Sequence, residues 1–195
     1  MQHRGLLLLF AGALAPAPVA PLAAREPFAK AHVQMMARSE TKGAPLRLVD
    51  VDVWAEGARL KARVRNSAAA GELWVDGLAS APLRILNGRI ADPRPRTLEA
   101  GLQLALRAGG SQDLGSSRND RVAGHPCKIV TEELKGGMTM TRCMWRGLPL
   151  SVEVQGKGFS FNAAATMVEE GQVTVADLQP PPGAPAAPGS LSAGR

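Results

Sequence analysis

Residues 46–65 read LRLVDVDVWAEGARLKARVR, and this stretch predicts two antiparallel strands joined by a tight turn at Glu56-Gly57. In each half, apolar residues alternate with charged ones, the pattern of a strand with one face on a core and one face in water. The residues expected to face the core are Val49, Val51, Val53, Leu60, Ala62 and Val64. Leu46 and Leu48 break the alternation, so we expect a β-bulge near Leu48.

The outward face of the second strand carries a row of basic residues: Arg59, Lys61, Arg63 and Arg65. Such a row could meet phosphates or lipid headgroups. We favour a solvated face paired with Asp50, Asp52 and Glu56 of the preceding strand, because opposite charges on neighbouring strands stabilise a sheet.

The same alternation recurs along the chain, with turns rich in Gly and Pro between the segments. Residues 97–107 predict one clear helix, with Thr97 as its N-cap. The apolar stripe of this helix is Leu98, Leu102, Ala105 and Leu106. The other expected strands are 32–41, 71–75, 83–86, 127–134, 138–145, 149–155, 158–166 and 172–178, and residues 111–121 are expected to form a loop. Short connections favour antiparallel neighbours, so the predicted fold class is α+β, a curved antiparallel sheet with a helix on its inner face.

The composition excludes several classes of protein. Hydrophobic residues make up 45% and charged residues 21% of the 195 residues, which indicates a globular chain rather than a disordered one. The net charge of +6 is too small to indicate nucleic acid, and aromatic residues, at 4%, supply few surfaces for base stacking. Two cysteines and three histidines cannot build a four-ligand zinc site without carboxylates. We expect no nucleic-acid partner, no metal and no cofactor.

Both ends of the chain read as segments outside the fold. Residues 1–24 combine a basic start, an apolar run of about ten residues and small residues at the end, as in a cleaved secretory signal peptide. An uncleaved anchor is the alternative, but the run is short for a membrane span. Residues 179–195, rich in Pro, Ala and Gly, predict a disordered tail, which leaves residues 28–178 as the folded domain. The expected location is the periplasm or the exterior, with no stable membrane span after cleavage.

Cys127 and Cys143 flank a turn at Gly136-Gly137. A hairpin centred on Lys135 would place the two cysteines directly opposite each other, within reach of a disulfide. In an exported protein this bond is expected to form, and it would contribute about 3 kcal/mol by restricting the unfolded chain. A redox pair is the alternative, but the C-x-x-C spacing is missing. A nucleophile formed by Cys127 and His125 is less favoured, because a bridged thiol cannot attack.

No enzyme signature occurs in the sequence: G-x-S-x-G, H-E-x-x-H, a phosphate-binding loop and an EF-hand loop are all missing. The adjacent acids Glu132-Glu133 and Glu169-Glu170 point to opposite faces of a strand, so neither pair suggests an acid–base couple. Each of the tryptophans 54, 74 and 145 is expected to pack in the core or at its rim. We predict no catalytic residue and a non-enzymatic protein.

The run 144–153, MWRGLPLSVE, resembles the C-terminal half of an uncharacterised family of exported bacterial domains that is similar to the LolA/LolB-like periplasmic lipoprotein-carrier superfamily. The corner motif of the resemblance is Trp145, Gly147, Leu148, Pro149 and Leu150. Residues 54–61, 124–130, 162–166 and 173–180 also resemble strands of that family. The resemblance implies a strongly curved antiparallel half-barrel with one or two helices packed on the concave side. It also implies an apolar concavity for acyl chains and no catalytic residue.

One helix is too small to cover such a sheet, so an uncovered apolar strip is expected to form a groove. Its candidate lining residues are Val49, Val51, Val53, Leu60, Val64, Met140, Val152, Val154, Phe159 and Phe161. Met138, Met140 and Met144 would give that surface adaptability. The alternative is that these residues fill the core beneath the helix. The predicted function is binding of an apolar ligand, a lipid, an acyl chain or a lipidated protein, and the alternative is an interaction or sensor module for another envelope protein.

Overall fold

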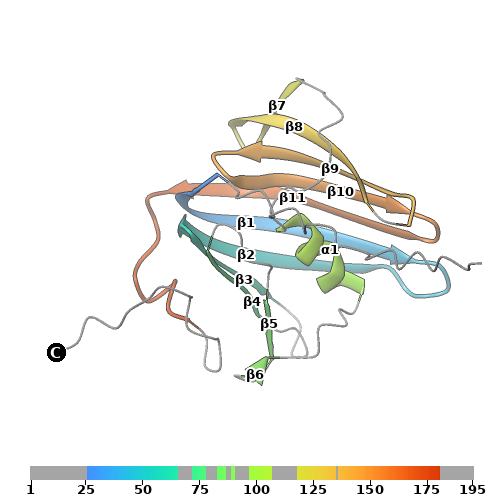
Figure 1. The fold of residues 1–195 in the computed structure, drawn as a ribbon, viewed down its shortest axis with the longest axis horizontal. Helices are drawn as coiled ribbons and strands as arrows, with labels where there is room; N and C mark the ends of the chain where they lie inside the picture. Colours follow the sequence, from blue (N-terminus) through green and yellow to red (C-terminus); the bar gives the residue numbers. More distant parts are fainter. Residues whose placement is uncertain are drawn as a thin grey trace, which may run out of the picture.

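The computed structural model of this protein describes residues 26–65, 72–77, 83–86, 89–90, 97–106, 118–134 and 136–180 (Figure 1). In these residues the chain forms an 11-stranded sheet and one short helix, α1, at Thr97–Ala105. The strands are β1 Phe28–Thr41, β2 Arg47–Gly57, β3 Arg59–Val64, β4 Glu72–Asp76, β5 Leu83–Leu86, β6 Arg89–Ile90, β7 Asn119–Val122, β8 His125–Leu134, β9 Met138–Trp145, β10 Leu148–Gly156 and β11 Phe159–Glu170.

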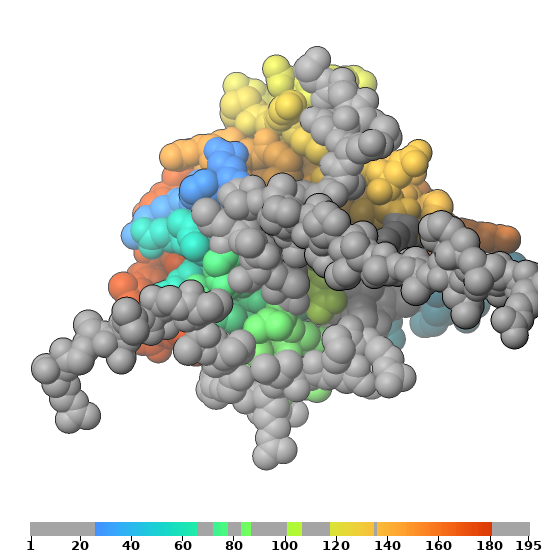
Figure 2. Space-filling model, in the orientation of Figure 1, coloured from blue at the N-terminus to red at the C-terminus, as the bar shows by residue number. Residues whose placement is uncertain are grey.

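The sheet is antiparallel throughout, with the strand order β6-β5-β4-β3-β2-β1-β11-β10-β9-β8-β7. The first long strand and the last one, β1 and β11, pair at its centre, and β6 and β7 are its two edges. In Figure 2, in the same orientation, the yellow-to-orange strands fill the upper part of the molecule and the cyan-to-green strands the lower part. The structure therefore bears out one unclosed, mostly antiparallel sheet with one short helix, which supports the α+β class only loosely.

Helix α1 packs against β1, β10 and β11, and Figure 1 shows it in front of the middle of the sheet. We call the face that α1 covers the inner face and the opposite one the outer face. Leu102, Ala105 and Leu106 are buried, as their predicted stripe requires. Gly101 lets the helix approach closely, because a Cβ atom at this position would lie 2.2 Å from Cγ of Phe161.

The hydrophobic core lies along the inner face. In β3, Leu60, Ala62 and Val64 are at most 7% exposed, which confirms the alternation predicted for this strand. Central strand β1 contributes a second alternating set of buried residues, Ala31, Val33, Met35 and Ala37. The core thus collects one residue in two from the central strands.

The corner after β9 explains the motif on which the resemblance rests. Trp145 pairs with Leu148, so Arg146 and Gly147 form a two-residue hairpin loop. Both have positive φ, 46° and 80°, as the tightest hairpin turns require. A Cβ atom at Gly147 would lie 2.7 Å from the carbonyl oxygen of Pro27, so the close approach of the chain before β1 also demands glycine here.

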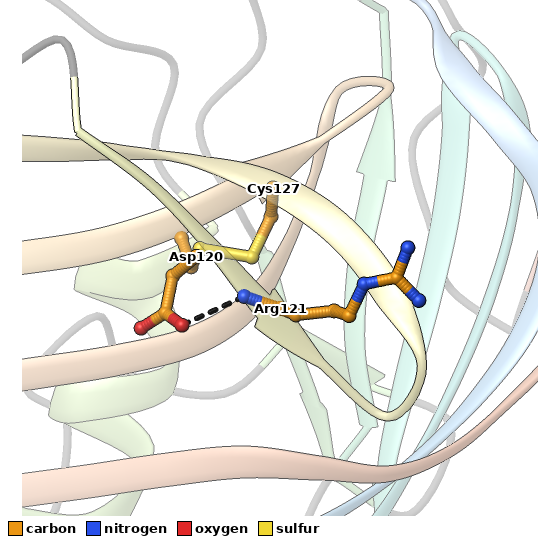
Figure 3. The surroundings of a disulfide bond; sticks show 4 residues. Asp120, Arg121 and Cys127 are labelled. Carbon is orange, nitrogen blue, oxygen red and sulfur yellow. Dashed lines mark hydrogen bonds between the residues drawn. A yellow bond between two sulfur atoms is a disulfide. The ribbon is translucent and has the colours of Figure 1, made fainter.

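The expected disulfide between Cys127 and Cys143 is present, with a Cα–Cα distance of 5.3 Å (Figure 3). The predicted register was wrong: β8 pairs Leu134 with Met138, and Cys143 lies opposite Ile129. The hairpin is therefore centred on Gly136 rather than on Lys135, and the cysteines meet diagonally. Two consecutive glycines, 136 and 137, both at positive φ, set this loop.

The neighbourhood of the bridge includes the edge strand β7, where a loop had been predicted. Asp120 pairs with Cys127, and its carboxylate accepts a hydrogen bond of 2.7 Å from the backbone N–H of Arg121 (Figure 3). Residues 119–122 therefore form a strand although their sequence is polar, because β8 has a free edge with which they can pair. The rest of that predicted loop, 111–117, lies outside the described residues.

Two further predictions fail. No bulge occurs near Leu48: the register between β1 and β2 is continuous from Ala31↔Ala55 to Ser39↔Arg47. Leu46 and Leu48 are instead exposed, at 48% and 61%.

Residues 172–178 form no strand: 172–174 are irregular and 175–178 form turns. The carboxylate of Asp177 accepts hydrogen bonds from the backbone N–H and the hydroxyl of Thr174, at 2.8 and 2.7 Å. Such local side-chain bonds compete with strand pairing. The signal peptide, the tail from residue 181 onward and the side chain of Leu98 lie outside the described residues.

Candidate functional site

Beneath α1, the inner face encloses a small apolar cavity of about 10 Å³. This volume accommodates no more than about one water molecule. The lining residues are Val33, Met35, Val53, Leu102, Ala105, Leu106, Leu148, Pro149, Val152 and Ala163. The inner face is therefore closed by side chains at this place.

The ten predicted groove residues come together on the inner face. Eight of them are at most 7% exposed: Val51, Val53, Leu60, Val64, Met140, Val152, Val154 and Phe161. Val49 and Phe159 are partly buried and pack against the same core. Val53 and Val152 line the cavity itself. The predicted set is thus brought into one apolar cluster, which here is packed as a core.

Sequence reasoning missed part of the lining. Val33 and Met35 lie on β1, where the pair Met35-Met36 hides the alternation, and Ala163 is small enough to be overlooked. Leu148 and Pro149 belong to the predicted corner motif, so that motif contributes directly to the cavity. The signal that could have found the β1 residues is the two-residue spacing of Ala31, Val33, Met35 and Ala37.

A buried ion pair holds the C-terminal end of α1. The guanidinium of Arg142 on β9 donates a hydrogen bond of 3.4 Å to the carbonyl oxygen of Ala105 and pairs with the carboxylate of Glu132 on β8. Arg142 and Glu132 are only 4% and 5% exposed. Cations are favourable at a helix C-terminus, so Arg142 ties the helix to the sheet.

The outer face carries a row of side chains that are cross-strand neighbours from β11 to β4. In order, they are Glu169, His32, Trp54, Lys61 and Trp74. The imidazole of His32 lies between two carboxylates, 2.9 Å from Glu169 and 3.2 Å from Asp52, and stacks on Trp54.

The predicted basic row is held in place by this arrangement. Arg65 lies 3.1 Å from the carboxylate of Asp52, as the predicted pairing requires. Lys61 and Arg63 instead lie over the ring of Trp54, at 5.3 and 5.2 Å from its centroid.

A similar cluster lies at the other histidine of the described chain. The ring of His125 meets Trp145 edge to face at 4.9 Å, and Arg146 covers Trp145. Glu170 lies 2.9 Å from Arg146 and 3.6 Å from His125. His125 is thus a structural partner at the strand entrance rather than part of a Cys–His pair.

Among the described residues, no group of three or more His, Cys, Asp or Glu side chains could hold a metal ion. In the same part of the chain, none of the helical segments reaches the length and apolarity of a membrane span. The fold and the site together define a single-sheet protein with an apolar inner face under a short helical cover.

No family model matches this sequence, and no curated protein matches it. Solved structures do resemble it. A LolA superfamily protein, NE2245 from Nitrosomonas europaea, has 12% sequence identity and a TM-score of 0.46, covering 80% of this chain and 92% of that one. MucB, solved in complex with MucA(peri), has 20% identity and a TM-score of 0.43, covering 78% of this chain and 53% of that one. LprF from Mycobacterium bovis has 13% identity and a TM-score of 0.30, covering 77% and 90%.

This chain therefore spans about half of the MucB chain. One of the three similar structures is a LolA superfamily protein, and the corner motif of this sequence resembles the same superfamily.

Proposed function

We propose that this chain is a non-enzymatic, exported binding protein that takes an apolar ligand between α1 and the inner face. The ligand class is a lipid, an acyl chain or a lipidated protein. The observation that carries the proposal is the cavity beneath α1, because its lining consists of apolar residues from α1, β1, β2, β10 and β11. Burial of an acyl chain there would contribute a favourable free energy of binding of about 25 cal/mol per Å² of apolar surface.

The cover is small enough to move. Helix α1 has 9 residues, and helices of this length are marginal without tertiary contacts. Among the described side chains of this segment, Leu102, Ala105 and Leu106 are buried and Leu104 packs partly against the same core, and Arg142 donates a hydrogen bond to the carbonyl of Ala105. Displacing α1 would expose an apolar surface to water, and an apolar ligand would cover that surface again.

The test is a lipid extract of the gently purified protein, analysed by mass spectrometry, together with titration of a fluorescent fatty acid. We expect a co-purified lipid and saturable binding of the fatty acid. A protein that carries no lipid and leaves the fatty acid unbound would refute the proposal and favour the interaction module.

The replacement Gly101→Ala should strengthen binding of the fluorescent fatty acid by about three- to tenfold. The new Cβ atom would collide with the Phe161 ring, so α1 would be pushed off the sheet and the open state would be more populated. Thermal unfolding should show a stability loss of about 1–3 kcal/mol.

Gln103→Ala is the matched control, because it raises helix propensity in the same helix without a collision at Phe161. Its fatty-acid affinity should stay at the wild-type value. A folded Gly101→Ala chain with wild-type affinity would show that α1 is not the movable cover.

Export rests on the predicted signal peptide at residues 1–24 and on the disulfide, since such bonds persist in oxidising compartments. We expect the mature protein to lack these residues and to appear in the periplasmic or external fraction. The intact mass of the protein from each cell fraction checks this. A full-length chain confined to the cytosol would contradict it.

A further inference from the structure

Among the described residues, three exposed apolar side chains lie together near one end of the outer face. Met36, Leu46 and Leu48 are 54%, 48% and 61% exposed. Leu48 pairs with Arg38, two positions from Met36 on β1, so Met36 and Leu48 are diagonal neighbours on the same face. Leu46 precedes Leu48 by two positions and extends the set toward the end of the sheet. We call these three side chains the exposed apolar patch.

The two leucines of the patch belong to a hairpin that projects from the end of the sheet. Residues 42–48, which connect β1 to β2 and include the start of β2, are all exposed. A hydrogen bond of 2.9 Å from the N–H of Ala44 to the carbonyl of Thr41 closes the turn. Figure 1 shows this turn at the same end of the sheet as the turn between β10 and β11. The N–H of Lys42 donates a hydrogen bond of 2.9 Å to the carbonyl of Gly158, which holds the two turns side by side.

Three cations surround the tips of these two hairpins. Lys42, Arg47 and Lys157 are exposed, and within the part of the chain that the structure describes none of them forms an ion pair. Glu40, the acid closest in sequence to Lys42, is paired with Arg38. The end of the sheet therefore presents positive charge that no acid of the described chain offsets by direct contact.

Two further acids lie on the outer face beside the patch. Asp50 pairs with Met36, at the end of the patch away from the hairpin tip. Glu153 is on β10, two strands from β1, and accepts a hydrogen bond from the side chain of Gln155. Neither acid lies at the tip, so the positive charge is concentrated where the hairpin projects farthest.

Exposed apolar side chains between cations suit an anionic lipid surface. The apolar groups enter the boundary between headgroups and acyl chains, and the cations meet the lipid phosphates. A second copy of this chain suits the patch less well, because contact through this end would bring Lys42, Arg47 and Lys157 of both copies together. The sign of the charge thus favours lipid over self-association.

We propose that residues 42–48 and Lys157 form a docking site for an anionic lipid surface. Leu46 and Leu48 enter the interface, and Lys42, Arg47 and Lys157 bind headgroup phosphates. The chain then lies on the membrane through one end of its sheet. This site is separate from the cavity beneath α1 and does not depend on it, so either proposal can fail while the other holds.

Co-sedimentation with vesicles tests the proposal. The chain is used without residues 1–24, because their apolar run would bind lipid by itself, and all described residues lie after them. Vesicles of phosphatidylglycerol and phosphatidylcholine should bind it at least about tenfold more tightly than vesicles of phosphatidylcholine alone. High salt should reduce this difference, because it screens the headgroup charges. Equal binding to both kinds of vesicle, or binding to neither, would overturn the proposal.

The double replacement Leu46→Ser and Leu48→Ser should weaken binding to the anionic vesicles by about tenfold or more, because the apolar contact with the interface is lost. The matched control is Val175→Ser, which removes an apolar side chain that is 85% exposed and outside the patch. Its binding should equal that of the wild type. Equal binding by the double variant and the control would contradict insertion of the hairpin.

Both variants replace exposed side chains, so their unfolding midpoints should match the wild type. If the midpoint of the double variant changes, the single replacement Leu48→Ser takes its place.

The double replacement Lys42→Gln and Arg47→Gln should weaken binding to the anionic vesicles by about fivefold for each cation removed. The matched control is Lys30→Gln with Arg59→Gln, which removes the same charge from the other end of the sheet, where both residues form ion pairs. Binding of the control should stay within about twofold of the wild type, since its charges lie away from the lipid. Equal losses in the two variants would assign the attraction to net charge and overturn the site.

A single fluorescent label reports insertion directly. In Leu48→Cys the new thiol is the one that reacts, because the two native cysteines are bridged. An environment-sensitive dye at this position should shift its emission to shorter wavelength on anionic vesicles, and the same dye in Val175→Cys should not. An unchanged emission at Leu48→Cys would overturn insertion.

Light scattering without vesicles separates the remaining outcome. The wild type should be a monomer through this surface. A dimer that the Leu46→Ser and Leu48→Ser replacement dissociates would assign the patch to a second copy and overturn the lipid assignment.

Discussion

Replacing Glu132 by alanine should destabilise the folded chain by about 3–5 kcal/mol, the largest effect that we expect from a single substitution. The change leaves the guanidinium of Arg142 buried without its carboxylate, while Arg142 is 4% exposed. Removing one partner of a buried ion pair costs far more than the pair contributes, because the attraction that offset the desolvation of the remaining charge is lost. Urea unfolding of the variant and the wild type measures the difference.

Glu133→Ala is the matched control, because Glu133 is the next residue along β8 and is exposed. Its effect should stay within about 0.5 kcal/mol. The double variant Glu132→Leu with Arg142→Met should recover most of the stability, since both charges are gone and the volumes are similar. A loss below about 1 kcal/mol for Glu132→Ala would show that the pair is hydrated rather than buried.

Removing the disulfide by the double replacement Cys127→Ser and Cys143→Ser should cost about 3 kcal/mol, within a range of about 2–5. The bond joins residues separated by 16 positions and limits the unfolded chain. Both cysteines are also buried, at 4% and 3% exposure, so two hydroxyls would replace apolar sulfur in a packed site. Chemical unfolding of the oxidised wild type against the variant measures the loss.

Thiol labelling of the denatured, unreduced protein is the control for this experiment. It should find no free thiol, and two labelled cysteines would show that the bond does not form. Reduction of the wild type should lower stability toward that of the double variant. An unchanged unfolding midpoint after complete reduction would contradict the expected contribution of the bridge.

Local pattern was sufficient for much of the sheet. The bounds of β9, Met138–Trp145, match those predicted, those of β3 differ by one residue at its C-terminal end, and those of β10 differ by one residue at each end. These segments alternate apolar and polar side chains, and β9 and β10 are bounded by glycines, so neighbouring residues alone define them. The cysteine pair and the apolar inner-face residues were also visible, because an apolar stripe and a hairpin turn are short-range features.

Pairing over long distances was not visible. The predicted register of the cysteine hairpin was wrong, because either of two neighbouring residues could occupy the centre of its loop. Gly136 occupies the centre instead of Lys135, which shifts the cross-strand partner of each residue by two positions. Residues 172–178 alternate like a strand, yet Thr174 and Asp177 form a local turn there. In both cases, interactions that are invisible in the alternation of side chains decided the outcome.

The sequence by itself determined the strands β3, β9 and β10 and which side of each is apolar, because these properties depend on residues two positions apart. Only the tertiary structure decided that β1 and β11 meet at the centre, that α1 closes the apolar surface over a cavity of about 10 Å³, and that Val173 and Leu178 are buried apart from the main core. The physical reason is that burial depends on which distant segments share a face, and this follows from the packing of the whole sheet.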